Sequence, residues 1–568
     1  MQRFRLLILS IPLYLALPGA APGDAIVRSQ AMLAATIAEF FIEGDRIRVE
    51  LEIGLGDLAA FHNILPDEVY EGMGNRPHRL QERMPLFFQN DLAITAGDGR
   101  PLEGRIVEIG PRVRVRRDEI TGEPLPPDES EEEIVVFARL EYLLPGRPEA
   151  LKIRAQGSNA NIGFVVYHRG IAVNDFRYLM PFQSLDLDWG DPWYTQFKNR
   201  NLRRAHFEPM SGFIYVEPYE VRKEIILRPR DLQHWIDLGL ANRDAIPVEI
   251  QAELMQRVAA FLREHHVVEI DGERIEPELA RINFLDRTLT ASRVIDPPVE
   301  LDAYSAILGA IFVYPTDGLP KRVTMDWDLW SDRIQRVPAA SVDQAGPLPT
   351  FLEPDFRVLE WQNFLKQPDL PTLRVLEPPP GAIDDWVSRS RWFLAVVALG
   401  VSAWWTRSPR KRVGVLVAAW MAVAACFWIV RDAFDSQERM SEVMSGLLHN
   451  IYRAFDYREE ERIYDTLERS VTGDLLTEIY LEARSGLELA NQGGARVKVK
   501  EIELVEFEAR PARSGGFSAL ATWNVAGSVG HWGHVHQRRN QYRAELDVAP
   551  VDGAWKLVAL EILEEERL

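Results

Sequence analysis

Three histidines near the C-terminus have the residue types and spacing that could hold a metal ion. They are His531, His534 and His536, in the stretch His-Trp-Gly-His-Val-His. Residues two apart on a strand share a face, so His534 and His536 can present two imidazoles to one ion, with His531 reaching across a turn. Zinc or copper would need a further ligand, and the sequence nominates none. The alternative is a polar strand that lines a cavity or an interface, in which Arg538 and Arg543 pair with acids. We therefore name the three histidines as metal ligands for zinc or copper and expect no other cofactor.

Aromatic residues are frequent between about residues 156 and 212. Large aromatic side chains supply much of the binding energy of interfaces and also stack on sugars. We name Trp189, Trp193 and Tyr194 as interaction residues. The alternative is that these rings fill a seam between two domains.

Motifs for common catalytic chemistries are not recognisable in the chain. It has no Gly-rich phosphate loop, no nucleophile elbow and no zinc-binding helix, and no spacing of serine and histidine singles out a triad. The sequence therefore predicts a protein that is not an enzyme.

The length and charge of the chain limit its class. A chain of 568 residues exceeds a single core and predicts three or four domains. The formal net charge of −20 argues against nucleic acid as a partner, because phosphate contacts need basic faces. The single cysteine, Cys426, excludes an intramolecular disulfide, so burial alone must stabilise the domains.

Residues 1–25 have the pattern of a signal peptide. Arg3 and Arg5 precede an apolar stretch from Leu6 to Leu17 and the small residues Gly19-Ala20-Ala21. An uncleaved anchor is the alternative, and it would leave the orientation of the rest unchanged.

Residues 391–431 predict a two-helix transmembrane hairpin. Two apolar runs, Trp392–Thr406 and Val413–Val430, flank a basic connector at residues 407–412. The first run spans only about 21 Å as a helix, so its flanking arginines and tryptophans must reach the interface. A buried helical hairpin in a soluble domain is the alternative. A basic tip in the cytoplasm predicts the bacterial inner membrane, with both remaining regions in the periplasm and the lipid bilayer as a partner.

The region before this hairpin contains an internal repeat. Residues 47–53 are echoed by residues 221–227, and the positions that follow share their spacing. Each copy continues with a helical segment, then Asp98-Gly99 or Asp271-Gly272 as a tight turn, and then an apolar strand that ends at proline. Alternating apolar residues describe half-buried strands. We expect two β-sandwich-like modules, with an inserted helix in each, over residues 26–211 and 212–345; chance similarity of hairpins is the alternative.

A proline-rich strap follows at residues 346–390. Proline restricts the chain to extended conformations, so we expect a semi-rigid spacer with one short helix near residues 356–366.

Residues 432–568 predict an α+β domain of three helices followed by a four-stranded antiparallel sheet. Helical spacing covers residues 440–455, 457–470 and a third segment after Thr472. Four strand patterns follow at residues 496–509, 517–527, 534–548 and 555–563, and the last begins within the stretch Asp552-Gly-Ala-Trp-Lys556. This order resembles the cone-shaped fold of the ketosteroid isomerase and nuclear transport factor superfamily. The resemblance implies a curved sheet around a pocket, used by some members for proton transfer and by many for binding or assembly. No stretch matches the isomerase's catalytic aspartate and tyrosine, so no catalytic residue is transferred.

Taken together, the patterns predict a multidomain, non-catalytic scaffold or assembly component of an envelope complex, with other envelope proteins or a second copy as partners through the C-terminal domain. A metal-binding or delivery protein that uses the histidine strand is one alternative. An enzyme that uses the pocket of the C-terminal domain is the other.

Overall fold

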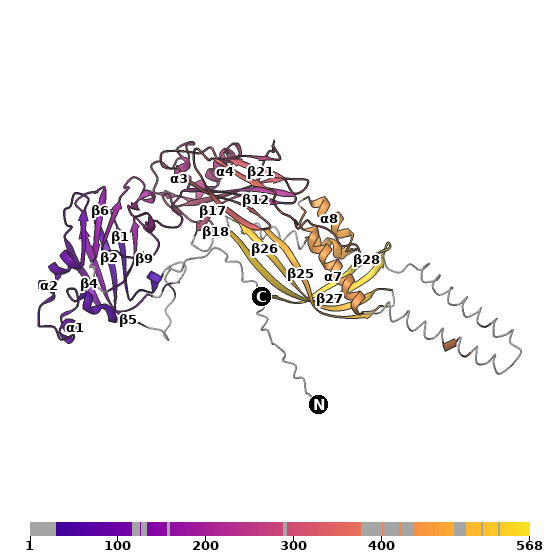
Figure 1. Ribbon diagram of the computed structural model, residues 1–568, viewed down its shortest axis with the longest axis horizontal. Helices are drawn as coiled ribbons and strands as arrows, with labels where there is room; N and C mark the ends of the chain where they lie inside the picture. The colour runs from indigo at the N-terminus through magenta and orange to yellow at the C-terminus, as the bar shows by residue number, and fades with distance from the viewer. Residues whose placement is uncertain are drawn as a thin grey trace, which may run out of the picture. The chain divides into compact units, whose positions relative to one another are not determined.

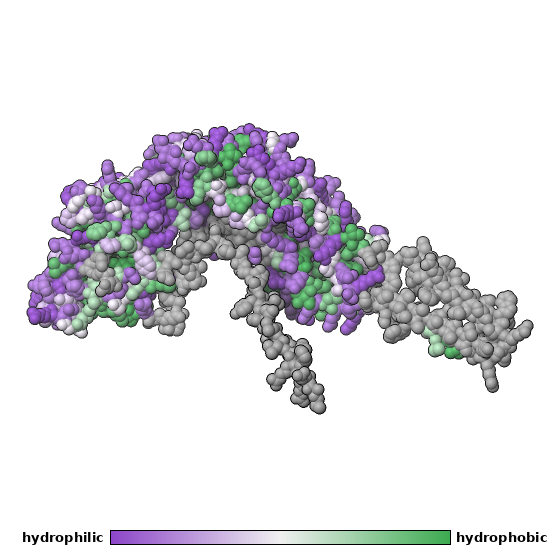
Figure 2. All heavy atoms as spheres, in the orientation of Figure 1, coloured by the Kyte–Doolittle hydropathy of each residue, from purple (hydrophilic) through white to green (hydrophobic). Residues whose placement is uncertain are grey.

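A computed structural model describes most of the chain. The described residues are 30–115, 117, 125, 133–155, 160–287, 292–376, 400, 417, 420–421, 437–457, 459–481, 496–512, 515–531 and 534–568. The chain divides into two compact units, Met1–Ala205 and His206–Leu568. Hydrophilic side chains cover most of the visible surface of the described residues (Figure 2).

The first unit is built on two β-sheets. The larger has the strand order β4-β5-β2-β1-β7-β8, with β9 also pairing with β7, and the smaller has the order β11-β10-β6-β3 (Figure 1). The strands are β1 (Thr36–Ile42), β2 (Arg46–Gly54), β3 (Leu92–Ala96), β4 (Gly104–Val113), β5 (Ile134–Leu143), β6 (Ala150–Ala155), β7 (Ile162–His168), β8 (Ile171–Ala172), β9 (Arg177–Tyr178), β10 (Phe182–Asp186) and β11 (Gln196–Phe197). Apolar residues of both sheets meet in one core, which explains the alternating pattern of the sequence.

Short helical segments complete the first unit. They are η1 (Gln30–Leu33), η2 (Leu55–Phe61), α1 (Asp67–Gly72), α2 (Leu80–Leu86), η3 (Phe87–Asp91), η5 (Pro192–Tyr194) and η6 (Arg200–Leu202). The buried guanidinium of Arg83 in α2 donates to the carbonyls of His62 and Leu65 and to Asp67, and so ties α2 to the loop before α1.

The second unit begins with a module of two larger sheets and one two-stranded sheet. The sheet orders are β18-β17-β20-β13-β12-β22-β23, β16-β15-β21-β24 and β14-β19. The strands are β12 (Met210–Glu217), β13 (Glu220–Leu227), β14 (Ala245–Ile246), β15 (Val267–Ile270), β16 (Glu273–Arg274), β17 (Glu278–Arg287), β18 (Ser292–Val294), β19 (Leu301–Asp302), β20 (Ile307–Pro315), β21 (Arg322–Asp326), β22 (Val337–Asp343), β23 (Gly346–Leu352) and β24 (Val358–Gln362). Helices α3 (Pro229–Leu232) and α4 (Val248–Glu264) bury apolar residues in the same core.

The module of the second unit has the topology of the first unit. In the first, β1 pairs antiparallel with β2 and parallel with β7. In the second, β12 pairs antiparallel with β13 and parallel with β22. The segments that repeat in the sequence are the equivalent strands β2 and β13, which pair in turn with β5 and β20. Gly99 in one turn and Asp271 and Gly272 in the other adopt the positive φ that a tight turn requires.

The C-terminal domain also lies in the second unit. Helices α7 (Gln437–Ala454) and α8 (Glu460–Glu468) lie over a four-stranded antiparallel sheet of order β25-β26-β27-β28, and residues 474–481 are helical (Figure 1). The strands are β25 (Arg496–Pro511), β26 (Phe517–His531), β27 (His534–Val551) and β28 (Ala554–Arg567). The apolar face of α7 packs on the inner face of the sheet, against residues such as Trp523 and Leu546. The superfamily resemblance stays a prediction.

Part of the predicted strap is sheet. The short helix predicted near residues 356–366 is wrong, because β24 occupies residues 358–362 and pairs with β21. Its side chains alternate between exposed and buried, with Leu359 and Trp361 in the core, which is the period of a strand. Residues 363–376 lie outside the sheets, and residues 377–390 of the predicted strap lie outside the described residues.

The predicted membrane anchoring is corrected. No helix in the described ranges is long and apolar enough to cross a bilayer. The longest of them, α4 and α7, are amphipathic and expose most of their charged residues. This finding contradicts the two-helix transmembrane hairpin, and with it the inner-membrane location. Residues 391–431 lie outside the described residues, apart from Gly400, Val417, Trp420 and Met421, and the predicted signal peptide, residues 1–25, also lies outside them.

Candidate interaction site along helix α7

An extended segment of the chain lies along helix α7. We call residues 369–376 the docked strap. It runs antiparallel to the helix: Asp369 contacts Arg453, Arg374 contacts Asn450, and Leu376 lies against Gly446. The docked strap thus follows about two turns of α7. Among the described residues, this is the segment whose contacts most resemble those of a bound peptide.

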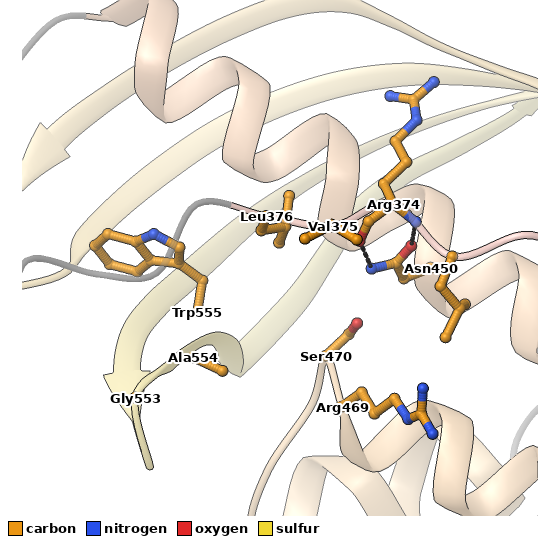
Figure 3. Close-up of a pocket in the computed structure, with 10 residues that line it drawn as sticks. Arg374, Val375, Leu376, Asn450, Arg469, Ser470, Gly553, Ala554 and Trp555 are labelled. Carbon is orange, nitrogen blue, oxygen red and sulfur yellow. Dashed lines mark hydrogen bonds between the residues drawn. The ribbon is translucent and has the colours of Figure 1, made fainter.

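Two side-chain amides hold the backbone of the docked strap. Asn450, which is buried in α7, accepts from the Arg374 N–H at 2.7 Å and donates to the Arg374 carbonyl at 3.1 Å (Figure 3). Gln344, in the turn between β22 and β23, makes the same pair of bonds with the backbone of Asp369, both at 2.7 Å. An amide side chain carries both an NH2 donor group and an accepting carbonyl oxygen, so each satisfies both backbone polar groups of one strap residue.

A buried arginine binds the first side chain of the docked strap. The Arg453 guanidinium donates to both carboxylate oxygens of Asp369 at 3.0 Å and to Asp456 at 2.9 Å. One guanidinium nitrogen, Nη2, makes both bonds to Asp369, and the other, Nη1, makes the bond to Asp456. The Arg453 side chain is only 8% exposed, whereas that of Asp369 is 50% exposed, so water reaches the carboxylate side of the pair.

Further contacts run between these anchors. His449 Nε2 donates to the Thr372 carbonyl at 3.0 Å, and Arg374 donates to the Ser445 hydroxyl at 3.1 Å. Leu376 packs on the apolar core of the domain, over the buried Gly446. A Cβ at Gly446 would overlap the Leu376 side chain, so the glycine forms a notch for it.

A cavity of about 230 Å³ lies beside the docked strap. Its lining includes Leu373, Leu376, Ser470, Ala554 and Trp555. Figure 3 shows the Ser470 hydroxyl directed toward the strap, whereas the Arg374 guanidinium extends away from Asn450. The strap therefore does not fill the groove in which it lies.

The three predicted metal ligands lie at the hairpin between β26 and β27. The antiparallel register pairs His531 with His534, and Val529 with His536. Their side chains are outside the described part, so the metal site stays a prediction. Among the described residues no group of three or more His, Cys, Asp or Glu could hold a metal ion.

The three predicted interaction residues lie in or beside η5 of the first unit. Trp193 is buried, and the Arg204 guanidinium lies 3.9 Å from its ring centroid. Trp189 is half-buried and donates through its indole nitrogen to the Pro148 carbonyl, and Tyr194 is half-buried. These contacts are made within the unit itself. Binding of a partner by the three residues stays a prediction.

Among the described residues, the buried Lys223 of β13 has the environment most typical of a catalytic amine. Its ammonium donates to three carbonyls at the C-terminal end of α4, those of Leu262, His265 and His266. Burial lowers the pKa of Lys223 to about 7. Since the last carbonyls of a helix have no intrahelical partner, this amine acts as a cap.

The neighbouring His266 is also structural. It is fully buried, with its ring stacked 3.9 Å from that of Trp327, and burial lowers its pKa to about 4. A neutral ring stacked in a core packs like an aromatic side chain.

Comparison with known proteins does not extend these observations. No protein-family model matches the chain, and no curated protein matches its sequence.

The residues of the α7 groove were not singled out from the sequence. Asn450 and Arg453 fall within a predicted amphipathic helix, where nothing distinguishes them from other polar residues. Asp369 lies in a proline-rich segment that predicts only an extended chain. The one available signal was Trp555, in the Asp552–Lys556 stretch at the start of the last strand, and it lines the cavity.

Proposed function

We propose that this protein is a non-catalytic scaffold, an assembly component of a multiprotein complex. The observation that supports this function is the docked strap, held by Gln344 of the second module at one end and by Asn450 of the C-terminal domain further along. These hydrogen bonds hold one segment of the chain against two domains, which is a positioning role and involves no covalent chemistry. They also join the second module and the C-terminal domain into one compact unit.

The duplicated module supports the same function. Two modules of equal topology repeat the same arrangement of strands on one chain. The buried cation of the second module, Lys223, is engaged by the helix end, as a structural group is. Repeated modules, and a domain that binds an extended segment, suit an assembly protein, whose function is to position other proteins.

The native mass of the full chain tests the proposal. A tagged chain purified under native conditions from the cells that produce it should elute with one or more partners in fixed stoichiometry, at a mass above the 64.8 kDa of one copy. A homogeneous 64.8 kDa species that retains no stoichiometric partner would contradict the scaffold.

A metal-binding protein is the second candidate, because the strand register places His531 opposite His534. Elemental analysis of the purified full chain, with and without His534→Ala and His536→Ala, separates the two. The scaffold predicts that the double variant keeps its partners. Metal binding predicts near-stoichiometric zinc or copper in the wild type and its loss in the variant.

A further inference from the structure

Most of the hydrogen bonds that hold the docked strap are made to its backbone. Asn450 and Gln344 contact only main-chain atoms, and His449 contacts a main-chain carbonyl. Backbone contacts accept many sequences, as in other proteins that bind extended peptides. Among the described contacts, three side chains of the strap are recognised: the Asp369 carboxylate by Arg453, Leu376 by the notch at Gly446, and the Arg374 guanidinium by the exposed Ser445 hydroxyl.

The docked strap also leaves part of the groove empty. A hollow of about 230 Å³ beside it is open to solvent, and the Val375 side chain, which lines this hollow, is 98% exposed. The groove therefore has room for a bulkier segment than the one it holds.

We propose that the α7 groove is a peptide-binding site whose partner is an extended segment of another protein, and that the docked strap is its built-in competitor. This proposal rests on the scaffold function and names the site and the class of its partner. The partner segment has a carboxylate side chain followed seven residues later by a branched apolar residue, the spacing of Asp369 and Leu376. Between them it has larger apolar side chains than the strap.

The charge requirement follows from Arg453. This cation is buried, and among the described residues its other carboxylate partner is Asp456, three residues later in the chain. A segment without an acid at the first position would leave a buried guanidinium partly unpaired, which disfavours binding.

The covalent connection between the docked strap and α7 sets how strongly the strap competes with a free peptide. The strap and α7 belong to one chain, joined through residues 377–436, so the strap competes at an effective concentration that a free peptide must exceed. Free peptide must therefore compete with a nearly saturated site in the wild-type chain. Weakening the strap's own anchors should expose the groove without altering α7.

The experiment measures fluorescence anisotropy of a labelled peptide with the sequence of residues 367–378, titrated with three forms of the full chain. The first is the wild type. The second is the released chain, with Asp369→Asn and Leu376→Ala. The third adds Asn450→Ala and Arg453→Met to the released chain. Circular dichroism verifies that each form is folded, and Asp369→Asn alone serves as a milder release.

We expect the released chain to bind the peptide at least about 10-fold more tightly than the wild type, and the third form to lose that gain. A peptide with Asn in place of Asp at the first anchor should bind the released chain more weakly. Equal affinity for wild-type and released chains, equal affinity for the second and third forms, or no binding to any form would overturn the proposal. The native mass measurement is independent of these titrations: stoichiometric partners without peptide binding would leave the scaffold and remove the groove as its site.

Discussion

Lys223 is the residue whose burial has the clearest consequence for stability. Its folded pKa of about 7 lies below its ordinary value of 10.5, because burial disfavours the ammonium. Between these values the unfolded chain holds a proton that the folded chain does not. Stability therefore rises with pH in this window, and the penalty is fully present below pH 7.

The variant Lys223→Met isolates this contribution. One group whose pKa differs in this way between the folded and unfolded chain raises the free energy of unfolding by up to about 1.4 kcal/mol per pH unit. Between pH 7.5 and 9 this amounts to about 2 kcal/mol. Urea unfolding of the wild type and of Lys223→Met at both pH values measures it, since all other groups are common to the two proteins. A wild type whose stability relative to the variant stays constant over this range would show that the amine keeps its ordinary pKa.

Asn450 holds the backbone of the docked strap at Arg374 through two hydrogen bonds. Asn450→Ala removes both hydrogen bonds to Arg374 and leaves that backbone unpaired beside the helix, at a cost of roughly 1–3 kcal/mol. We expect faster hydrogen exchange at the Arg374 amide and easier proteolysis of residues 369–376. Asn540→Ala is the control, because Asn540 bonds Tyr542 and Glu565 in the sheet and does not touch the strap. Equal exchange at Arg374 in both variants would count against this role.

At the scale of elements, Gly446 couples α7 to the strap. Gly446→Ala should raise the helix propensity of α7 by about 1 kcal/mol, while the new methyl group displaces Leu376 from its notch. We therefore expect strap exchange to increase without a fall in the melting temperature of the domain. Gly72→Ala, at the end of α1 where an added Cβ meets nothing, is the matched control. If Leu376→Ala and Gly446→Ala loosen the strap additively, the two residues do not share one contact.

Strands and helices differ in how far the sequence could predict them. Strands β25 to β28 begin at or within one residue of the predicted starts, because alternating apolar residues mark each of them. Strand β24 was missed since prolines and polar residues around it obscured the alternation of Leu359 and Trp361. The predicted membrane hairpin rested on hydropathy and tip charge alone, over runs near the lower limit for spanning, and the described helices do not support it.

The candidate site could not be predicted for a different reason. Its contacts join residues 369–376 with residues 445–457, more than 70 positions later in the chain. No local spacing reports such a pairing, and Asn450 becomes distinctive only when the strap lies against it. The predicted histidines were recognisable because their chemistry is local to one hairpin.

At the scale of the whole molecule, the two units have separate cores and should unfold separately. The core of the first unit is formed only by residues before Ala205, and those of the second unit only by later residues. Units that share no core unfold as distinct transitions unless a large apolar interface couples them. One glycine in each unit allows the transitions to be assigned.

Gly163→Ala and Gly212→Ala should each lower a different transition in scanning calorimetry of the full chain. In β7 a Cβ at Gly163 would overlap the Ala31 carbonyl of η1, and in β12 a Cβ at Gly212 would lie 2.7 Å from the buried ring of Trp327. Overpacking of this kind costs roughly 1–3 kcal/mol, which corresponds to about 2–4 °C per kcal/mol for units of this size. Gly110→Ala in β4, where an added Cβ meets nothing, should shift neither transition. If both substitutions lower one common transition by the same amount, the two units fold as a single cooperative body.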